Sequence, residues 1–299
     1  MRKLIIEPIA ADSLGVRSFS ILVKSPDIRI LIDPGIAFAP KRYGLPPHPI
    51  ELETLDILAK KIEEKGKDVD VIIVTHYHRD HFAYGNRITP RIYENKVILI
   101  KNPKKNINPS QKYRRAPFFL RILEKYAAKK VEYADNREFV FNNTVIRCSS
   151  PVPHGNDSRL GFVIQVMIEY KGERVLYTSD VEGLHMDEQI NFIVEASPQI
   201  IFLDGPPIYL WSRKENNQAL IDNTIENILQ IIHDVKPKYL VMDHHVMRDK
   251  QCNALFKKLQ EYLERTSVTK LFTSATFSNK QERLLEAYRA ELYSQYIID

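Results

Sequence analysis

The sequence predicts an α/β fold in which helices cover largely buried sheets. Short apolar runs, often β-branched, alternate along the chain with longer segments that have the spacing of amphipathic helices. The run Val71–Val74 is uninterrupted, as in strands that are buried on both faces. No stretch with the composition of a linker divides the 299 residues, so we expect a single domain over residues 1–299.

In the first half of the chain, two apolar runs flank the turn Ser25-Pro26-Asp27 and are expected to pair with each other. Gly66 is expected to close the first long helix. The predicted strands are Ser18–Lys24, Ile28–Ile32, Val71–Val74 and Lys96–Ile100, and the predicted helices are about Leu52–Glu64 and Phe118–Lys130.

The second half continues this alternation. Lys171-Gly172 separates two apolar runs and predicts a hairpin. The predicted strands are Val145–Cys148, Phe162–Tyr170, Arg174–Thr178, Ile200–Leu203, Tyr239–Met242 and Lys270–Thr273, and the predicted helices are Ala219–His233, Leu255–Glu264 and a C-terminal helix from about Lys280.

Composition and charge are those of an ordinary globular protein. Hydrophobic residues make up 44% and charged residues 27%, which excludes collagen-like and disordered chains. The formal net charge of +5 is too small by itself to indicate a nucleic-acid-binding protein. The two cysteines, Cys148 and Cys252, form no CxxC pair, which favours a reduced intracellular compartment.

The N-terminus begins like a signal peptide, but Glu7 and Pro8 interrupt its apolar run. No apolar stretch approaches the roughly 18 residues that a membrane helix needs. We therefore expect a cytoplasmic protein without a membrane partner. The sequence carries no indication of an oligomeric state.

Histidines and aspartates cluster directly after a predicted strand. The segment His76-Tyr77-His78-Arg79-Asp80-His81 follows Val71–Val74. Because alternate residues of an extended segment share a side, His76 and His78 can converge on one ion while Asp80 and His81 meet a second. Imidazole nitrogen and carboxylate oxygen are suitable zinc ligands. The cluster therefore predicts a metal site rather than a solvated loop.

The pattern His76-x-His78-x-Asp80-His81 resembles the signature of the metallo-β-lactamase superfamily. Four further segments match the other motifs of that superfamily in order along the chain: Asp33 after a strand, Pro153-His154-Gly155, Thr178-Ser179-Asp180 and Met242-Asp243-His244-His245. The residues around Asp180 and the histidine pair are most similar to an archaeal branch of predicted metal-dependent hydrolases. The resemblance implies a four-layer αββα sandwich of two mainly mixed β-sheets, with the active site in a groove along their common edge.

The resemblance also implies two divalent metal ions and a hydroxide shared between them that attacks the substrate. Zinc is the expected metal, and Mn or Fe would also suit ligands without a thiolate. The implied ligands are His76, His78 and His154 for one ion, Asp80, His81 and the fifth-motif histidine for the other, and Asp180 between them. Asp33 and Asp243 would lie behind the ligands, with Asp33 fixing the tautomer of an imidazole.

Two adjacent histidines compete for one ligand position at the fifth motif. Asp243 ends its strand as Thr75 does, which places His244 directly after the strand and favours it as the ligand. His245 would then face the substrate as a proton donor, and the reverse assignment is the alternative. Asp80 and His245 are thus the expected catalytic residues.

Three other residues are candidates for the substrate side of the site. Arg17 lies in the first turn, where it could hold an anion. His185 follows Asp180 by five residues, although an exposed loop histidine is the simpler interpretation. Asp204 ends the predicted strand Ile200–Leu203 and could instead form a structural turn.

Seven basic residues and no acidic ones lie between Lys101 and Arg121, with Tyr113, Phe118 and Phe119 interleaved. Basic charge with aromatic platforms suits single-stranded nucleic acid or another phosphorylated ligand, and a solvated surface is the alternative. We therefore expect a metal-dependent hydrolase whose substrate is a small-molecule or nucleic-acid phosphoester. A lactone, ester or thioester hydrolase and a non-hydrolytic metalloprotein are the alternatives.

Overall fold

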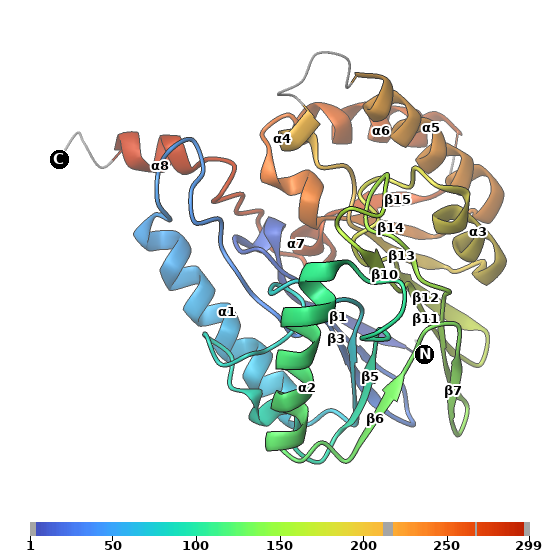
Figure 1. Ribbon diagram of the computed structural model, residues 1–299. Helices are drawn as coiled ribbons and strands as arrows, with labels where there is room; N and C mark the ends of the chain where they lie inside the picture. Colours follow the sequence, from blue (N-terminus) through green and yellow to red (C-terminus); the bar gives the residue numbers. More distant parts are fainter. Residues whose placement is uncertain (1–3, 212–217, 267, 296–299) are drawn as a thin grey trace.

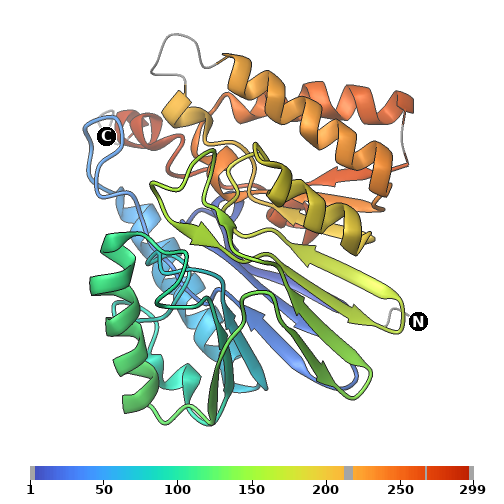
Figure 2. The ribbon, with the colours of Figure 1, turned by 45° about the vertical axis from the view of Figure 1, so that its right-hand side comes forward.

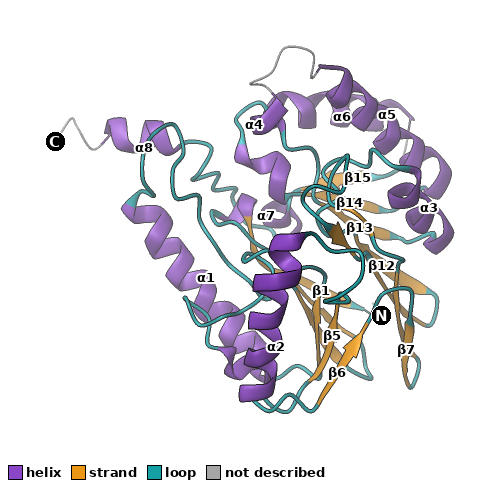
Figure 3. Ribbon diagram, in the orientation of Figure 1, coloured by secondary structure: helices purple, strands orange, loops and turns teal. Residues whose placement is uncertain are grey.

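Two mixed β-sheets lie face to face, and helices cover both outer faces (Figures 1 and 2). The computed structural model describes residues 4–211, 218–266 and 268–295. Helices lie on both sides of the strands (Figure 3). The predicted α/β class and the four-layer arrangement are confirmed.

The first sheet has the strand order β1-β2-β3-β4-β5-β6. β1 to β3 pair antiparallel, and β3 to β6 run parallel. Its strands are β1 (Ile5–Ala11), β2 (Phe19–Lys24), β3 (Arg29–Ile32), β4 (Val71–Val74), β5 (Val97–Ile100) and β6 (Lys130–Tyr133). The helices α1 (Pro49–Lys67) and α2 (Ala116–Lys125) cover its outer face.

The second sheet has the strand order β15-β14-β13-β12-β11-β8-β7, and β12 to β15 run parallel. Its strands are β7 (Glu138–Phe141), β8 (Thr144–Cys148), β11 (Val166–Tyr170), β12 (Glu173–Tyr177), β13 (Ile200–Leu203), β14 (Tyr239–Met242) and β15 (Lys270–Phe272). Helices α3 (Asp187–Ala196), α5 (Gln218–Val235) and α6 (Cys252–Thr266) pack on it. The remaining elements are β9 (Val152–Pro153), β10 (Phe162–Val163) and the short helices α4 (Ile208–Trp211), α7 (Ser274–Phe277) and α8 (Arg289–Gln295).

Three apolar layers hold the fold together, as the alternation along β4 illustrates. Val71 and Ile73 belong to the layer between the two sheets. Ile72 and Val74 belong to the layer under α1. A strand buried on both faces must be apolar at every position, which is why this run lacks the usual alternation with polar residues.

The structure also corrects several element predictions. Ile5–Ala11, expected only as an interrupted apolar run, forms the edge strand β1, which tolerates Pro8 beside a register shift. The predicted strand Phe162–Tyr170 divides into β10, which pairs with β9, and β11, which pairs with β12. The predicted helix Phe118–Lys130 ends earlier, because Lys130 begins β6.

The C-terminal segment does not form the helix predicted from Lys280. Residues 280–288 are irregular, and only Arg289–Gln295 is helical. The Arg283 amide donates to the Ser13 carbonyl, and the Arg289 guanidinium forms two bonds of 2.7 Å with Glu51 of α1. These long-range bonds hold the segment against the first half of the chain. In the described ranges, none of the helices combines the length and apolar character required to cross a membrane.

Candidate metal centre

The candidate residues lie at the carboxyl ends of strands from both sheets. Asp33 follows β3, and Thr75 and His76 follow β4, which pairs parallel with β3 in the register Ile32 to Ile73. In the second sheet, β12, β13 and β14 are parallel neighbours, so the residues that follow them emerge at one edge. The carboxyl ends of parallel strands are a common position for ligand sites.

The imidazoles of five histidines surround one carboxylate oxygen. Asp180 is 1% exposed, and its Oδ2 faces the Nε2 atom of each of these histidines. The distances to Oδ2 are 3.4 Å for His76, 3.2 Å for His81, 3.2 Å for His154, 3.6 Å for His244 and 3.9 Å for His245. A single carboxylate thus lies at the centre of residues that are far apart in the sequence.

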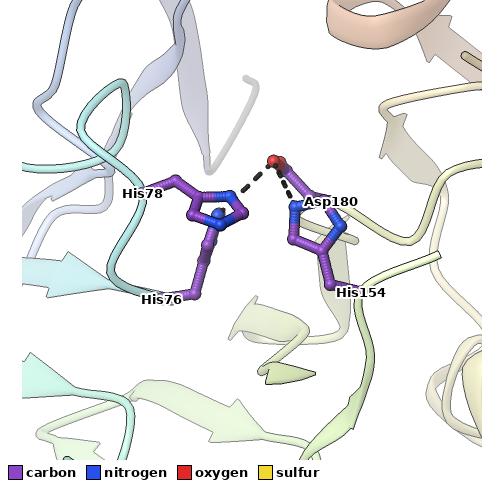
Figure 4. Close-up of side chains that lie close together, drawn as sticks. All are labelled: His76, His78, His154 and Asp180. Atoms are coloured by element: carbon purple, nitrogen blue, oxygen red, sulfur yellow. Dashed lines mark ion pairs between the residues drawn. The ribbon is translucent and has the colours of Figure 1, made fainter. Parts of the chain in front are cut away.

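His78 completes one group beside this carboxylate. Its ring centroid lies 4.7 Å from those of both His76 and His154. Figure 4 shows His76, His78 and His154 converging toward Asp180. Donor atoms of these four residues lie close enough together to hold one metal ion.

A second group also lies beside Asp180. The Asp80 carboxylate is 3.9 Å from His81 Nε2 and 3.8 Å from His244 Nε2. Asp80, His81 and His244 also have donor atoms close enough together to hold an ion. The two groups share Asp180 as their common neighbour.

A second layer of carboxylates fixes three of the imidazoles from behind. Asp33 lies 2.8 Å from His81 Nδ1, Asp12 lies 2.7 Å from His244 Nδ1, and Asp204 lies 3.0 Å from His245 Nδ1. A carboxylate at Nδ1 keeps the proton on that nitrogen and leaves the Nε2 lone pair free to bind a metal.

The close approach of two loops needs glycine at position 35. A Cβ atom there would lie 2.3 Å from the backbone nitrogens of His81 and Phe82.

Three residues of the centre, Asp33, Ser179 and His244, adopt left-handed backbone conformations, with φ of 47°, 57° and 65°. Such conformations are costly for non-glycine residues and persist where surrounding bonds enforce them.

The buried polar atoms at the centre fit a metal site. The Nε2 atoms of His76, His81 and His154 are buried and have no hydrogen-bond partner among the described residues. The same holds for Asp180 Oδ1. Buried polar atoms normally have partners, and nitrogen and carboxylate donors of this kind are those that zinc binds.

The electrostatics of the centre follow from burial and crowding. Burial alone would raise the pKa of Asp180, but His81, His244 and His76 outweigh it and hold that pKa well below its usual value. Burial and the charge of His154 lower the pKa of His78 to about 3. Asp180 is therefore ionised and His78 neutral near pH 7, which are the forms that bind metal.

Each of the three substrate candidates has a partner within the protein. Arg17 forms two bonds of 2.6 Å with Glu286, so its charge is already paired. His185 Nε2 lies 3.1 Å from the Glu182 carbonyl, within its own loop. Asp204 is fully buried behind His245. The substrate roles of these three residues stay predictions.

Asp243 lies behind the site, as expected, but it accepts from backbone amides and from the Ser13 hydroxyl rather than from an imidazole. Its carboxylate accepts from the amides of Ser13, His244 and Ser274. It therefore fixes the end of β14 against β1 and α7.

Three residues of the centre were not predicted from the sequence. Asp12 follows β1 as Asp33 follows β3. Because β1 was not predicted as a strand, the sequence did not indicate that Asp12 lies at a strand end. Glu182 lies 3.5 Å from His154 Nδ1 and 3.8 Å from His245 Nε2. Arg248 contacts both Asp12 and Asp80. No spacing in the sequence distinguishes Arg248 from the other arginines.

Comparison with known proteins agrees with this fold and site. The family model described as "Metallo-beta-lactamase superfamily" matches residues 14–226. The chain therefore belongs to the metallo-β-lactamase superfamily, whose fold is that of metal-dependent hydrolases.

Its relatives include the UPF0282 protein of Sulfurisphaera tokodaii, which is 46% identical over 290 residues, or 97% of this chain and 93% of the relative. The UPF0282 protein of Metallosphaera sedula is also 46% identical, with the same coverage. Among solved structures, the metallo-β-lactamase fold protein YhfI from Bacillus subtilis aligns with a TM-score of 0.53 and 12% identity, covering 91% of this chain and 98% of that one. The resemblance to an archaeal branch of the superfamily is confirmed.

Proposed function

We propose that the protein is a dinuclear metal-dependent hydrolase that acts on a phosphoester. The observation that carries this proposal is the convergence of five imidazole Nε2 atoms on Asp180 Oδ2. In the proposed arrangement, one ion is held by His76, His78 and His154, and the other by Asp80, His81 and His244. Asp180 lies between the two groups and serves both.

The donor set favours zinc and also suits Mn or Fe, because nitrogen and oxygen ligands occur without a thiolate. Two divalent ions held in this way would lower the pKa of water between them and stabilise negative charge on the group that is attacked. Asp33 and Asp12 would keep His81 and His244 in the metal-binding tautomer. Asp204 holds the proton of His245 on Nδ1, and burial keeps the pKa of His245 well below its usual value. Its Nε2 would therefore present a lone pair that accepts a proton, rather than act as the predicted proton donor.

The phosphoester preference rests on the basic segment, part of which lies beside the centre. Asn108 Nδ2 donates to the Arg159 carbonyl, and Gln111 Nε2 donates to the Leu160 carbonyl. These bonds attach the segment to the loop that follows His154. Arg115 lies near enough to the centre for its charge to lower the pKa of His78.

Lys101 does not contribute to this basic surface. It is 1% exposed and forms a 2.7 Å ion pair with Asp135. Arg114 is exposed and Arg115 half-buried at the end of the helical turn Gln111–Arg115. The proposal therefore places anion recognition at Arg114 and Arg115 rather than along the whole predicted segment.

The test is a panel of phosphodiester, phosphomonoester, lactone and thioester probes, assayed with zinc-loaded, manganese-loaded and metal-free protein. We expect hydrolysis of a phosphoester probe that requires metal and falls with added salt. Hydrolysis of only the lactone or thioester probes would contradict the phosphoester assignment. No metal-dependent hydrolysis of any probe would contradict the hydrolase assignment.

A charge-neutralising pair of variants tests the recognition site. Arg114→Ser with Arg115→Ser should raise KM about tenfold or more while changing kcat little, because these residues would bind substrate before and during reaction alike. The matched control removes two exposed charges from α6 with Lys257→Ser and Lys258→Ser. Equal KM and kcat values for the two double variants would contradict this recognition site and would indicate that the segment is a solvated surface.

A further inference from the structure

A buried arginine lies inside the candidate centre. Arg248 is 3% exposed and belongs to the short helical turn His244–Arg248 that follows β14. Its Nη2 lies 3.4 Å from Asp80 Oδ2, and its Nε donates to Asp12 Oδ1 at 2.9 Å. The guanidinium thus contacts one candidate ligand and the carboxylate that fixes another.

Arg248 covers the face of the His244 ring and does not occupy its lone-pair direction. Nη2 is almost equally far from the two ring nitrogens, at 3.3 Å from Nδ1 and 3.1 Å from Nε2. An atom in the ring plane at those distances would collide with a ring carbon, so Nη2 must lie above the plane. The Phe19 ring is stacked on His244, with centroids 5.5 Å apart and an interplanar angle of 5°. His244 Nε2 therefore stays directed at Asp180.

This arrangement makes the two groups of candidate ligands electrostatically unequal. A guanidinium keeps its positive charge in proteins, so Arg248 offsets the negative charge of Asp80. Among the described residues, Asp180 forms ion pairs with histidines and with no lysine or arginine. Within the described ranges, His76, His78 and His154 have no hydrogen bond to an arginine or lysine, and the half-buried Arg115 acts on His78 through its charge alone.

We propose that Arg248 sets the order in which the two positions bind metal. The position at His76, His78 and His154 fills first and tightly, and the position at Asp80, His81 and His244 binds its ion more weakly because of the fixed charge beside it. This inference rests on the proposed metal pair. It adds that the positive charge of Arg248 lowers the metal affinity of the second position.

The experiment is a calorimetric titration of chelator-treated full-length protein with zinc, without substrate. For the wild type we expect two separate binding steps. Arg248→Met should tighten the second step about tenfold or more and leave the first unchanged, since a like charge within a few ångströms is removed. Arg248→Lys keeps the charge and should resemble the wild type.

Lys250→Met is the matched control, because it removes a positive charge near the same turn from a side chain that pairs with Glu291. It should leave both steps unchanged. An unchanged or weakened second step in Arg248→Met would overturn the inference, as would equal tightening in Arg248→Met and Arg248→Lys.

The wild-type titration tests whether the two positions differ in zinc affinity, even if the methionine variant fails to fold. Two ions binding in one step with equal affinity would overturn the inference and leave the metal pair intact. Failure to bind any zinc would instead contradict the proposed function itself.

Discussion

Replacing Asp33 by asparagine should weaken the second metal position selectively. Asp33 is fully buried, and its Oδ1 accepts from the Thr75 amide at 2.8 Å. Its Oδ2 meets three groups, Thr75 Oγ1 at 2.6 Å, Tyr177 Oη at 2.8 Å and His81 Nδ1 at 2.8 Å. Asparagine can keep the first bond, but its NH₂ group would replace Oδ2.

The two hydroxyls can rotate to accept from that NH₂ group, whereas His81 can adapt only by moving its proton from Nδ1 to Nε2. A protonated Nε2 cannot bind a metal, so the change opposes the ligand form of His81. Loss of a supporting contact of this kind typically costs ten- to a hundredfold in metal affinity, or about 1.4–2.8 kcal/mol. Asp33 reaches the first position through Thr75 Oγ1, which lies 3.3 Å from His76 Nδ1, so that position should lose much less affinity.

Zinc titration of metal-free wild type and Asp33→Asn measures both steps. Asp27→Asn is the control, since Asp27 lies in the β2–β3 turn of the first sheet and accepts from the Asn143 amide and Thr144 Oγ1 of the second sheet. It should lower stability slightly and leave metal binding unchanged. Wild-type affinities in Asp33→Asn, or equal loss at both steps, would refute the tautomer argument.

Two further predictions concern the Asp180 carboxylate and the thiols. Asp180→Ala should lower the occupancy of both ions, because Oδ2 faces His154 and His81 at 3.2 Å, one from each group; elemental analysis that finds only one ion lost would refute the bridging role. Burial raises the pKa of Cys148 and of Cys252 to about 12, so at pH 8 only about 10⁻⁴ of each thiol is ionised in the folded protein. A thiol reagent should therefore react slowly with the native protein and rapidly with both cysteines in denaturant, and rapid labelling of the native protein would contradict this burial.

The α/β class and the candidate cluster His76–His81 could be predicted because they depend on local pattern. A buried strand must be apolar throughout, so Val71–Val74 is recognisable from its composition alone. The polar residues His76 to His81 directly follow it. The hairpin at Lys171-Gly172 was also predictable, and both residues have the positive φ that its turn requires.

The elements that were missed lack a strong local pattern. β6 and β7 have only four residues each and are exposed or half-buried, so their patterns are too short to identify a strand. The C-terminal segment has helical composition, but the bonds of Arg283 and Arg289 to distant residues outweigh that preference. Tertiary bonds override intrinsic helix propensity because each contributes as much as several residues of propensity.

The sequence by itself determined which residues are candidate ligands, through side-chain chemistry and strand-end position, which are local properties, and through the motifs that resemble those of the superfamily. Only the tertiary structure decided which carboxylate supports which imidazole, because Asp12 and His244 are 232 positions apart and lie 2.7 Å apart in space. It also decided that Arg17 pairs with Glu286, whereas Arg248 contacts Asp80 in the candidate centre. Sequence spacing cannot distinguish these two arginines, because the partner of a charged side chain is set by the packing of sheets and loops that are distant along the chain.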